Sequence, residues 1–207
     1  MAVIDLTMDF VGSRFATEIL REEVALNSGM TSYTGVVYTI KTDGMTGTYI
    51  DFPGHIAETD DGIRGDNCPL ENVFRVPAQV IRLNRESGSG AVTAAELEAA
   101  CGGRPETPAL VINALGDKEP FEIGFRTVYL DDSAVEWIIN RKCKLLVSDI
   151  YESTALHGVF LKLFANGVTT VCDPVKLGKL PESEVLLTAL FPLINVTQMP
   201  CRLVAEF

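Results

Sequence analysis

The sequence predicts a mixed α/β (α+β) fold, with a mixed β-sheet core and helices packed against it. Strand-like and helix-like runs alternate between residues 109 and 172, which is typical of parallel strands joined by crossover helices. The head and the tail are rich in strand-like runs, which indicates an antiparallel or mixed portion. Because 47% of the 207 residues are hydrophobic, we expect one sizeable core in a single domain, residues 1–207.

The first fifty residues are expected to hold strands and one helix. Residues 3–6 read as a short apolar strand, and residues 14–26 carry apolar side chains at helical spacing, which predicts a helix. Residues 35–42 are rich in β-branched and aromatic side chains, which predicts a strand. Asp43-Gly44 is typical of a hairpin turn, so a further strand is expected at 47–51.

The remaining elements follow from capping signals and apolar runs. Thr93 and Glu96 form a capping-box pattern, which predicts a helix that ends near residue 101. Residues 109–115 are apolar almost throughout, so this strand is expected to be buried on both faces. Further strands are expected at 77–83, 144–150, 168–172, 185–193 and 201–204, and further helices at 134–141 and 155–165.

Composition excludes several classes of partner. The formal net charge is −11 and the pI about 4.6, so the chain repels nucleic acid and anionic membranes, and we expect neither as a partner. No apolar run approaches the ~20 residues that a membrane-spanning helix needs. The five cysteines are odd in number and form no C-x-x-C pair. With no targeting segment at the N-terminus, a reduced, cytoplasmic protein is expected.

One stretch concentrates chemistry-bearing residues directly after a strand-like run. Side chains on a strand repeat every two residues, so Tyr49 and Asp51 are expected on one face. Pro53 ends the strand ladder and Gly54 permits a sharp turn, which allows His55 to approach Asp51. A carboxylate and an imidazole held together suit either metal binding or general acid–base catalysis.

The same stretch resembles the signature His-x-Gly-Thr-His-x-Asp-x-Pro-x-His of the metal-dependent cyclase/hydrolase family, which includes bacterial kynurenine formamidase and isatin hydrolase. The matching residues are Gly47, Thr48, Asp51, Pro53 and His55. Met45 and Tyr49 stand where the family has two metal-binding histidines. The resemblance extends over most of the chain. It implies a swivelling β/β/α cyclase-like fold, a small-molecule substrate, and a homodimer or homotetramer.

The resemblance also implies roles for single residues. Asp51 corresponds to the carboxylate that bridges the family's metals, His55 to its acid–base histidine, and His157 to a distal metal ligand. Cys172 stands where the family has a distal glutamate. Asp51, His157 and Cys172 would offer oxygen, nitrogen and sulfur to one divalent metal, and a thiolate favours zinc. A site without any metal is the alternative.

Three functions remain open on these residues. The first is a hydrolase of small cyclic amides, lactones or N-formyl compounds with one metal or none. The second is a metal-free lyase, isomerase or cyclase, in which Tyr49, Asp51, His55 and His157 form an acid–base network. There the pKa of Asp51 should rise, because its cationic partners are gone. The third is a non-catalytic relative that binds a small ligand.

Each candidate residue also has an ordinary structural interpretation. Thr48, Phe52 and Phe125 are candidate substrate contacts, although the two phenylalanines are equally ordinary as core or loop aromatics. Tyr49 could be a strand-packing aromatic, and Cys172 a buried, inert thiol. Asp51 could cap the turn at Pro53, and Met45 is best interpreted as an apolar side chain that fills the place of the missing metal ligands.

Overall fold

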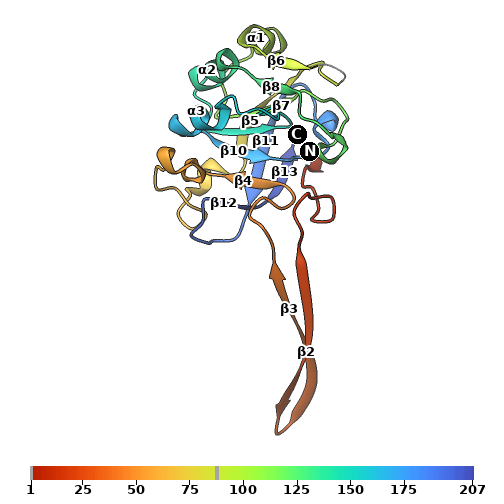
Figure 1. Ribbon diagram of the computed structural model, residues 1–207. Coiled ribbons are helices and arrows are strands. Elements are labelled where there is room, and N and C mark those ends of the chain that lie inside the picture. Colours follow the sequence, from red (N-terminus) through yellow and green to blue (C-terminus); the bar gives the residue numbers. More distant parts are fainter. Residues whose placement is uncertain (1, 87–88) are drawn as a thin grey trace.

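A computed structural model describes residues 2–86 and 89–207 as one mixed sheet with helices against it and a long arm that projects from it (Figure 1). The sheet has nine strands in the order β1-β13-β11-β5-β7-β9-β10-β4-β12. Their bounds are β1 Val3–Asp5, β4 Tyr49–Asp51, β5 Val76–Arg82, β7 Ala109–Asn113, β9 Leu145–Ser148, β10 Thr169–Cys172, β11 Glu184–Leu190, β12 Gln198–Pro200 and β13 Arg202–Glu206. This arrangement confirms the predicted mixed α/β class.

The centre of the sheet is parallel and its flanks are antiparallel. β5, β7, β9 and β10 run parallel, whereas β1, β4, β11, β12 and β13 pair antiparallel. All five residues of β7 are buried, as predicted, because layers cover both faces. Helices α1 (Ala94–Cys101), α2 (Asp132–Asn140) and α3 (Val159–Ala165) cover the face that Leu110 and Ile112 point toward.

The arm corrects the prediction for residues 14–26. They were expected to form a helix, but β2 (Glu18–Ser28) pairs antiparallel with β3 (Thr31–Lys41) in an exposed hairpin of two 11-residue strands. The spacing of apolar residues in this segment is compatible with both helical and strand periodicity. Pairing along the full length of β3 stabilises the strand. Gly29, in the expected helix stop, lies in the hairpin turn instead.

Asp43-Gly44 was also misinterpreted as a hairpin turn. β3 belongs to the two-stranded arm and β4 to the main sheet, so the segment between them is a turn that changes sheets. A backbone bond from Thr46 to the carbonyl of Asp43 closes it. The short strand β12 and the parallel pair β6 (Gly90–Val92) and β8 (Val128–Leu130) were not expected, because strands of three residues leave little pattern in a sequence.

The helix ends lie within one residue of the prediction, whereas the starts differ more. The Thr93 hydroxyl accepts a bond from the Glu96 amide, and the Asp131 carboxylate caps α2 through the Ala134 amide. The Glu96 carboxylate is bound by Arg85 instead of closing a capping box. Helix α3 begins four residues later than expected, after Gly158 in a left-handed conformation (φ 79°). None of the helices in the described ranges is long and apolar enough to cross a membrane.

Candidate active site

Strand β4 lies between β10 and β12, and its side chains alternate between the two faces of the sheet. In the register, Tyr49 lies beside Cys172 and Asp51 beside Thr170. Ile50 points into the opposite core layer. Tyr49 and Asp51 therefore share a face, as predicted, and the Cys172 sulfur lies 3.9 Å from Oδ2 of Asp51. Three of the predicted residues meet here.

The Asp51 carboxyl group is held in an unusual electrostatic environment. It is 2% exposed, and Oδ1 has no hydrogen-bond partner within residues 2–86 and 89–207. Burial disfavours the charged form and raises the pKa of Asp51 to about 7; the nearby negative charge of Asp173 adds to this effect, while the bond from Cys172 opposes it. Asp51 is thus poised between its two protonation states near neutral pH.

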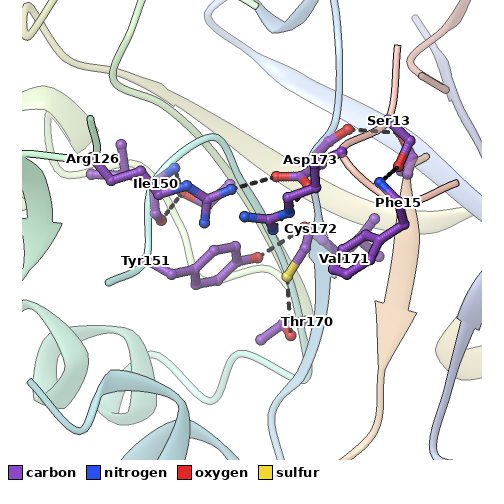
Figure 2. A network of polar contacts seen from close by, with 12 residues as sticks. Ser13, Phe15, Arg126, Ile150, Tyr151, Thr170, Val171, Cys172 and Asp173 are labelled. Atoms are coloured by element: carbon purple, nitrogen blue, oxygen red, sulfur yellow. Dashed lines mark hydrogen bonds and ion pairs between the residues drawn. The ribbon is translucent and has the colours of Figure 1, made fainter. Parts of the chain in front are cut away.

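The neighbours of Asp51 are protonated donors. Burial raises the pKa of the Tyr49 phenol and raises the pKa of the Cys172 thiol well above its usual range. Cys172 therefore faces Asp51 as a thiol. Figure 2 shows Cys172 on β10, with Thr170 and Tyr151 beside it. Met45 is partly buried and packs against the same core cluster as Tyr49, which fits its interpretation as apolar filling.

His55 lies on a 3-10 helix, Pro53–His55, directly after β4. Its ring is exposed and meets Phe164 edge-on, with centroids 6.4 Å apart. Partial burial lowers the pKa of His55, which favours the neutral imidazole. No hydrogen bond joins its ring to Asp51 in the part of the chain that the structure describes. The sharp turn at Pro53 is therefore present, but it does not join the two side chains by a hydrogen bond within the described residues.

His157 lies in the loop before α3 and is held there by three neighbours. Its ring stacks on Tyr129 with centroids 3.7 Å apart, and Nε2 lies 2.8 Å from the Ser153 hydroxyl. Its backbone amide donates to Glu152, which also accepts from the Val159 amide. Glu152 thereby ties this loop to the start of α3.

These placements bear on the expected metal site. Across the described residues, no group of three or more His, Cys, Asp or Glu side chains is arranged to hold a metal ion. A catalytic zinc needs three protein ligands. Here the His157 ring is engaged with Ser153 and Tyr129, and it does not join Asp51 and Cys172 in such a group. The predicted donors as placed do not fit a metal centre.

The three expected substrate contacts differ in accessibility. Thr48 is 1% exposed; its hydroxyl accepts a bond from the Met8 amide and donates one to the carbonyl oxygen of Asp173, both at 2.8 Å. Phe52 is 0% exposed and packs edge-on against Phe191, which makes it a core residue. Phe125 is 79% exposed and lines a cavity of about 220 Å³. Of the three, only Phe125 offers surface to a ligand.

A larger cavity of about 630 Å³ adjoins the end of β10. Asp173, the residue after Cys172, lines it in a left-handed conformation (φ 50°). Its carboxylate binds Arg14 at 3.3 Å. It also binds Arg126 at 2.8 Å (Figure 2). The sequence indicated neither arginine as a site residue. Arg14 lies in the segment predicted as a helix, and Arg126 lies in a stretch for which no element was predicted. The lining residues are Met8, Gly12, Ser13, Arg14, Pro120, Phe121, Ile123, Gly124, Arg126, Ser153, Thr154 and Asp173.

Comparison with known proteins agrees with this fold. A family model described as a putative cyclase matches residues 4–153. Isatin hydrolase A from Ralstonia solanacearum superposes with a TM-score of 0.78 at 18% identity, over 99% of this chain and 91% of that chain. Isatin hydrolase A from Labrenzia aggregata, bound to benzyl benzoate, gives 0.76 at 18% identity, over 99% and 93%.

A predicted metal-dependent hydrolase from Bacillus stearothermophilus is similar over 99% of this chain and 97% of that chain, with a TM-score of 0.68 and 17% identity. At identities this low, the similarity to these three structures establishes a shared fold. No curated protein sequence matches the chain.

Proposed function

Since the chain belongs to the putative cyclase family, we propose that it is an enzyme that hydrolyses small cyclic amides, lactones or N-formyl compounds. The proposal rests on Asp51, a buried carboxyl group with a raised pKa and an acceptor oxygen that the described chain leaves free. Buried titratable groups with shifted pKa values are concentrated at functional sites. The similarity to isatin hydrolases supports the same class of chemistry.

In this proposal, Oδ1 of Asp51 takes a proton from the attacking water. A general base works best when its pKa lies near the operating pH, which a value of about 7 satisfies. The water oxygen bonds to the acyl carbon, the C–N or C–O bond breaks, and the leaving atom takes up a proton. Tyr49 is a neutral donor beside Asp51 and is assigned to the acyl oxygen. His55, as the donor to the leaving atom, stays a prediction.

A panel of lactones, cyclic amides and N-formylanilines tests the activity, with ring opening or deformylation followed by absorbance. We expect turnover of at least one class, and a ~10²–10⁴-fold loss of kcat in Asp51→Asn, because general-base catalysis contributes about that much. Asp61→Asn is the matched control, since Asp61 is exposed. Full activity in Asp51→Asn, or no turnover of any class, would contradict the proposal.

The metal state is tested in the same assay. Zinc held by Asp51, His157 and Cys172 stays a prediction, and it would require the His157 ring to leave Ser153 and the thiol to ionise. Because the donors do not fit as placed, we expect turnover to survive dialysis against a chelator. Loss of turnover that zinc restores would favour the one-metal hydrolase instead.

A metal-free lyase, isomerase or cyclase is the second candidate. The observation that favours it is the contact between the buried Asp51 carboxyl group and the protonated Cys172 thiol, with the Tyr49 phenol on the same face of β4, since such groups can move protons without a metal. Such an enzyme would change a substrate without consuming water. Mass spectrometry distinguishes it from hydrolysis, because hydrolysis adds one water, about 18 Da, to the summed mass of the products, whereas an isomerisation leaves that mass unchanged.

We also infer a homodimer or homotetramer in which the β2–β3 arm makes the contact with a second copy. The arm exposes nine large apolar side chains: Ile19, Leu20, Val24, Leu26, Tyr33, Val36, Val37, Tyr38 and Ile40. Aromatic side chains bury ~150–250 Å² each in an interface, and the arm exposes two of them, Tyr33 and Tyr38, beside seven aliphatic side chains. An isolated two-stranded hairpin is marginally stable in water.

A cytoplasmic location stays a prediction, which the free state of all five cysteines supports.

A further inference from the structure

The 630 Å³ cavity beside β10 carries an excess of positive charge. Arg14 and Arg126 both reach it, and Asp173 is the one acidic side chain among the residues that line it. Two guanidinium groups facing one carboxylate leave a net charge of +1. The chain as a whole carries a formal charge of −11, so the charge of this cavity is opposite in sign to that of the molecule. It favours a ligand with one negative charge.

The two arginines have hydrogen-bonding capacity to spare. Within residues 2–86 and 89–207, each guanidinium group makes its single hydrogen bond to Asp173, through Nη2. A guanidinium group has five N–H donors in a planar fork that matches a carboxylate. Arg14 and Arg126 can therefore hold the Asp173 carboxylate and a second carboxylate at the same time.

Asp173 is itself fixed in place. Its φ of 50° is a conformation that residues other than glycine rarely adopt, and such residues persist where their surroundings hold them. The Thr48 hydroxyl donates to its carbonyl oxygen at 2.8 Å, and Pro174 follows it. A counter-ion held this firmly aims both guanidinium groups into the cavity when no ligand is present.

The rest of the lining is apolar or carries hydroxyl groups. Met8, Pro120, Phe121 and Ile123 provide an apolar wall, whereas Ser13, Ser153 and Thr154 carry hydroxyl groups. We propose that this cavity binds small organic monocarboxylates, with Arg14 and Arg126 clamping the carboxylate and the apolar wall contacting the hydrocarbon part.

The assignment rests on the proposed function and names the chemical class of its ligand. Hydrolysis of a cyclic amide or lactone adds water across the acyl bond. The acyl carbon becomes a carboxylate, and the leaving nitrogen or oxygen takes up one proton and stays on the same molecule. The second proton of the water is released, or is taken up by the nitrogen where that nitrogen is basic. The product is therefore a monocarboxylate attached to an organic body. Asp173, which lines the cavity, directly follows Cys172, and its charge acts on Asp51, so the clamp and the proposed base are neighbours in the fold.

Isothermal titration calorimetry with phenylacetate tests the clamp, with phenylacetamide as the neutral ligand of the same shape. We expect phenylacetate to bind at least 10-fold more tightly than the amide, and more weakly as salt rises. Arg126→Gln and Arg14→Gln should each weaken phenylacetate at least 10-fold and leave the amide unchanged. Arg126→Lys should recover only part of the loss, because it keeps the charge without the planar fork. Arg75→Gln is the control, since Arg75 pairs with Glu206 instead.

Each outcome of this experiment decides the assignment. Equal affinity for acid and amide, binding of neither, or unchanged phenylacetate affinity in both glutamine variants with wild-type melting temperatures would overturn it. Phenylacetate binding does not require turnover, so Asp51→Asn should bind phenylacetate as the wild type does. If the clamp binds while no hydrolysis is found, the proposed function fails and the binding site stands.

Discussion

At the residue scale, Asp51 couples the proposed chemistry to stability. Its pKa is about 7 in the folded protein against 3.8 for the free side chain, so between these values the folded state binds more protons than the unfolded state. Stability therefore falls as pH rises from about 4 to about 7. Above pH 7 the folded protein carries the full cost of a buried carboxylate whose Oδ1 lacks a partner in the described chain.

Asp51→Asn should remove that cost. We expect the variant to be more stable than the wild type at pH 8, by on the order of 3 kcal/mol, and to lose this advantage at pH 4.5. Urea denaturation at both pH values measures the difference. Asp149, whose pKa burial raises to about 6, contributes equally in both proteins and cancels. An advantage that is the same at pH 4.5 and pH 8 would show that Asp51 is ionised throughout.

Two buried threonines near β4 should differ in how replacement by valine changes the stability of the protein. Thr48 bonds the Met8 amide and the Asp173 carbonyl, whereas the Thr46 hydroxyl is buried without a partner among the described residues. Thr48→Val should cost about 2 kcal/mol, because it leaves buried polar groups unpaired. Thr46→Val should be neutral or stabilising. Chemical denaturation of both variants checks this, and equal losses would refute it.

The residues of the site were predicted where a local rule applied. Two-residue periodicity placed Tyr49 and Asp51 on one face, and the unbroken run from Gly167 brought Cys172 to the end of its strand. The surroundings of His157 depend on Tyr129 and Ser153, which come from β8 and a loop and form no motif with it. Side-chain contacts between separate elements do not appear in a linear pattern.

At the element scale, the arm shows how a local pattern can mislead. Its apolar residues fit helical spacing, but β2 finds a complete partner in β3, and the decisive information lies in the pairing. Over 11 residues a strand reaches about 36 Å. The arm therefore projects away from the body, as Figure 1 shows, and its exposed apolar side chains extend with it.

The proposed contact through the arm should be sensitive to charged substitutions near the tip of the hairpin. Leu26 and Tyr33 lie opposite each other on one face of the hairpin, near its tip. Changing both to Glu should convert the oligomer to a monomer, because like charges would then meet in an apolar contact. Analytical ultracentrifugation measures the mass. Ala25→Glu with Thr34→Glu is the matched control, since this pair lies on the other face at the same depth. A wild-type monomer, or equal effects of both double variants, would argue against an arm-mediated contact.

At the scale of the whole molecule, the fold class followed from the alternation of strands and helices, because that order restricts which connections are possible. The order of the strands in the sheet did not follow from this alternation. The strand β12 has three residues and contains Pro200, so it leaves little trace in the sequence, yet it forms the outer neighbour of β4. The cavity could not be predicted either, because it gathers residues from segments that are far apart in the sequence, between residues 8 and 173.

The place of β4 in the sheet also has a consequence for how the chain is made. Asp51 precedes its neighbour Cys172 by 121 residues, and β12 follows later still. At synthesis rates of about 5–20 residues per second, β4 leaves the ribosome on the order of ten seconds before either strand that will flank it. Contacts at such separations also form slowly. The candidate active site is therefore among the last parts of the body to assemble, and a nascent chain that stops before residue 198 leaves one edge of β4 open.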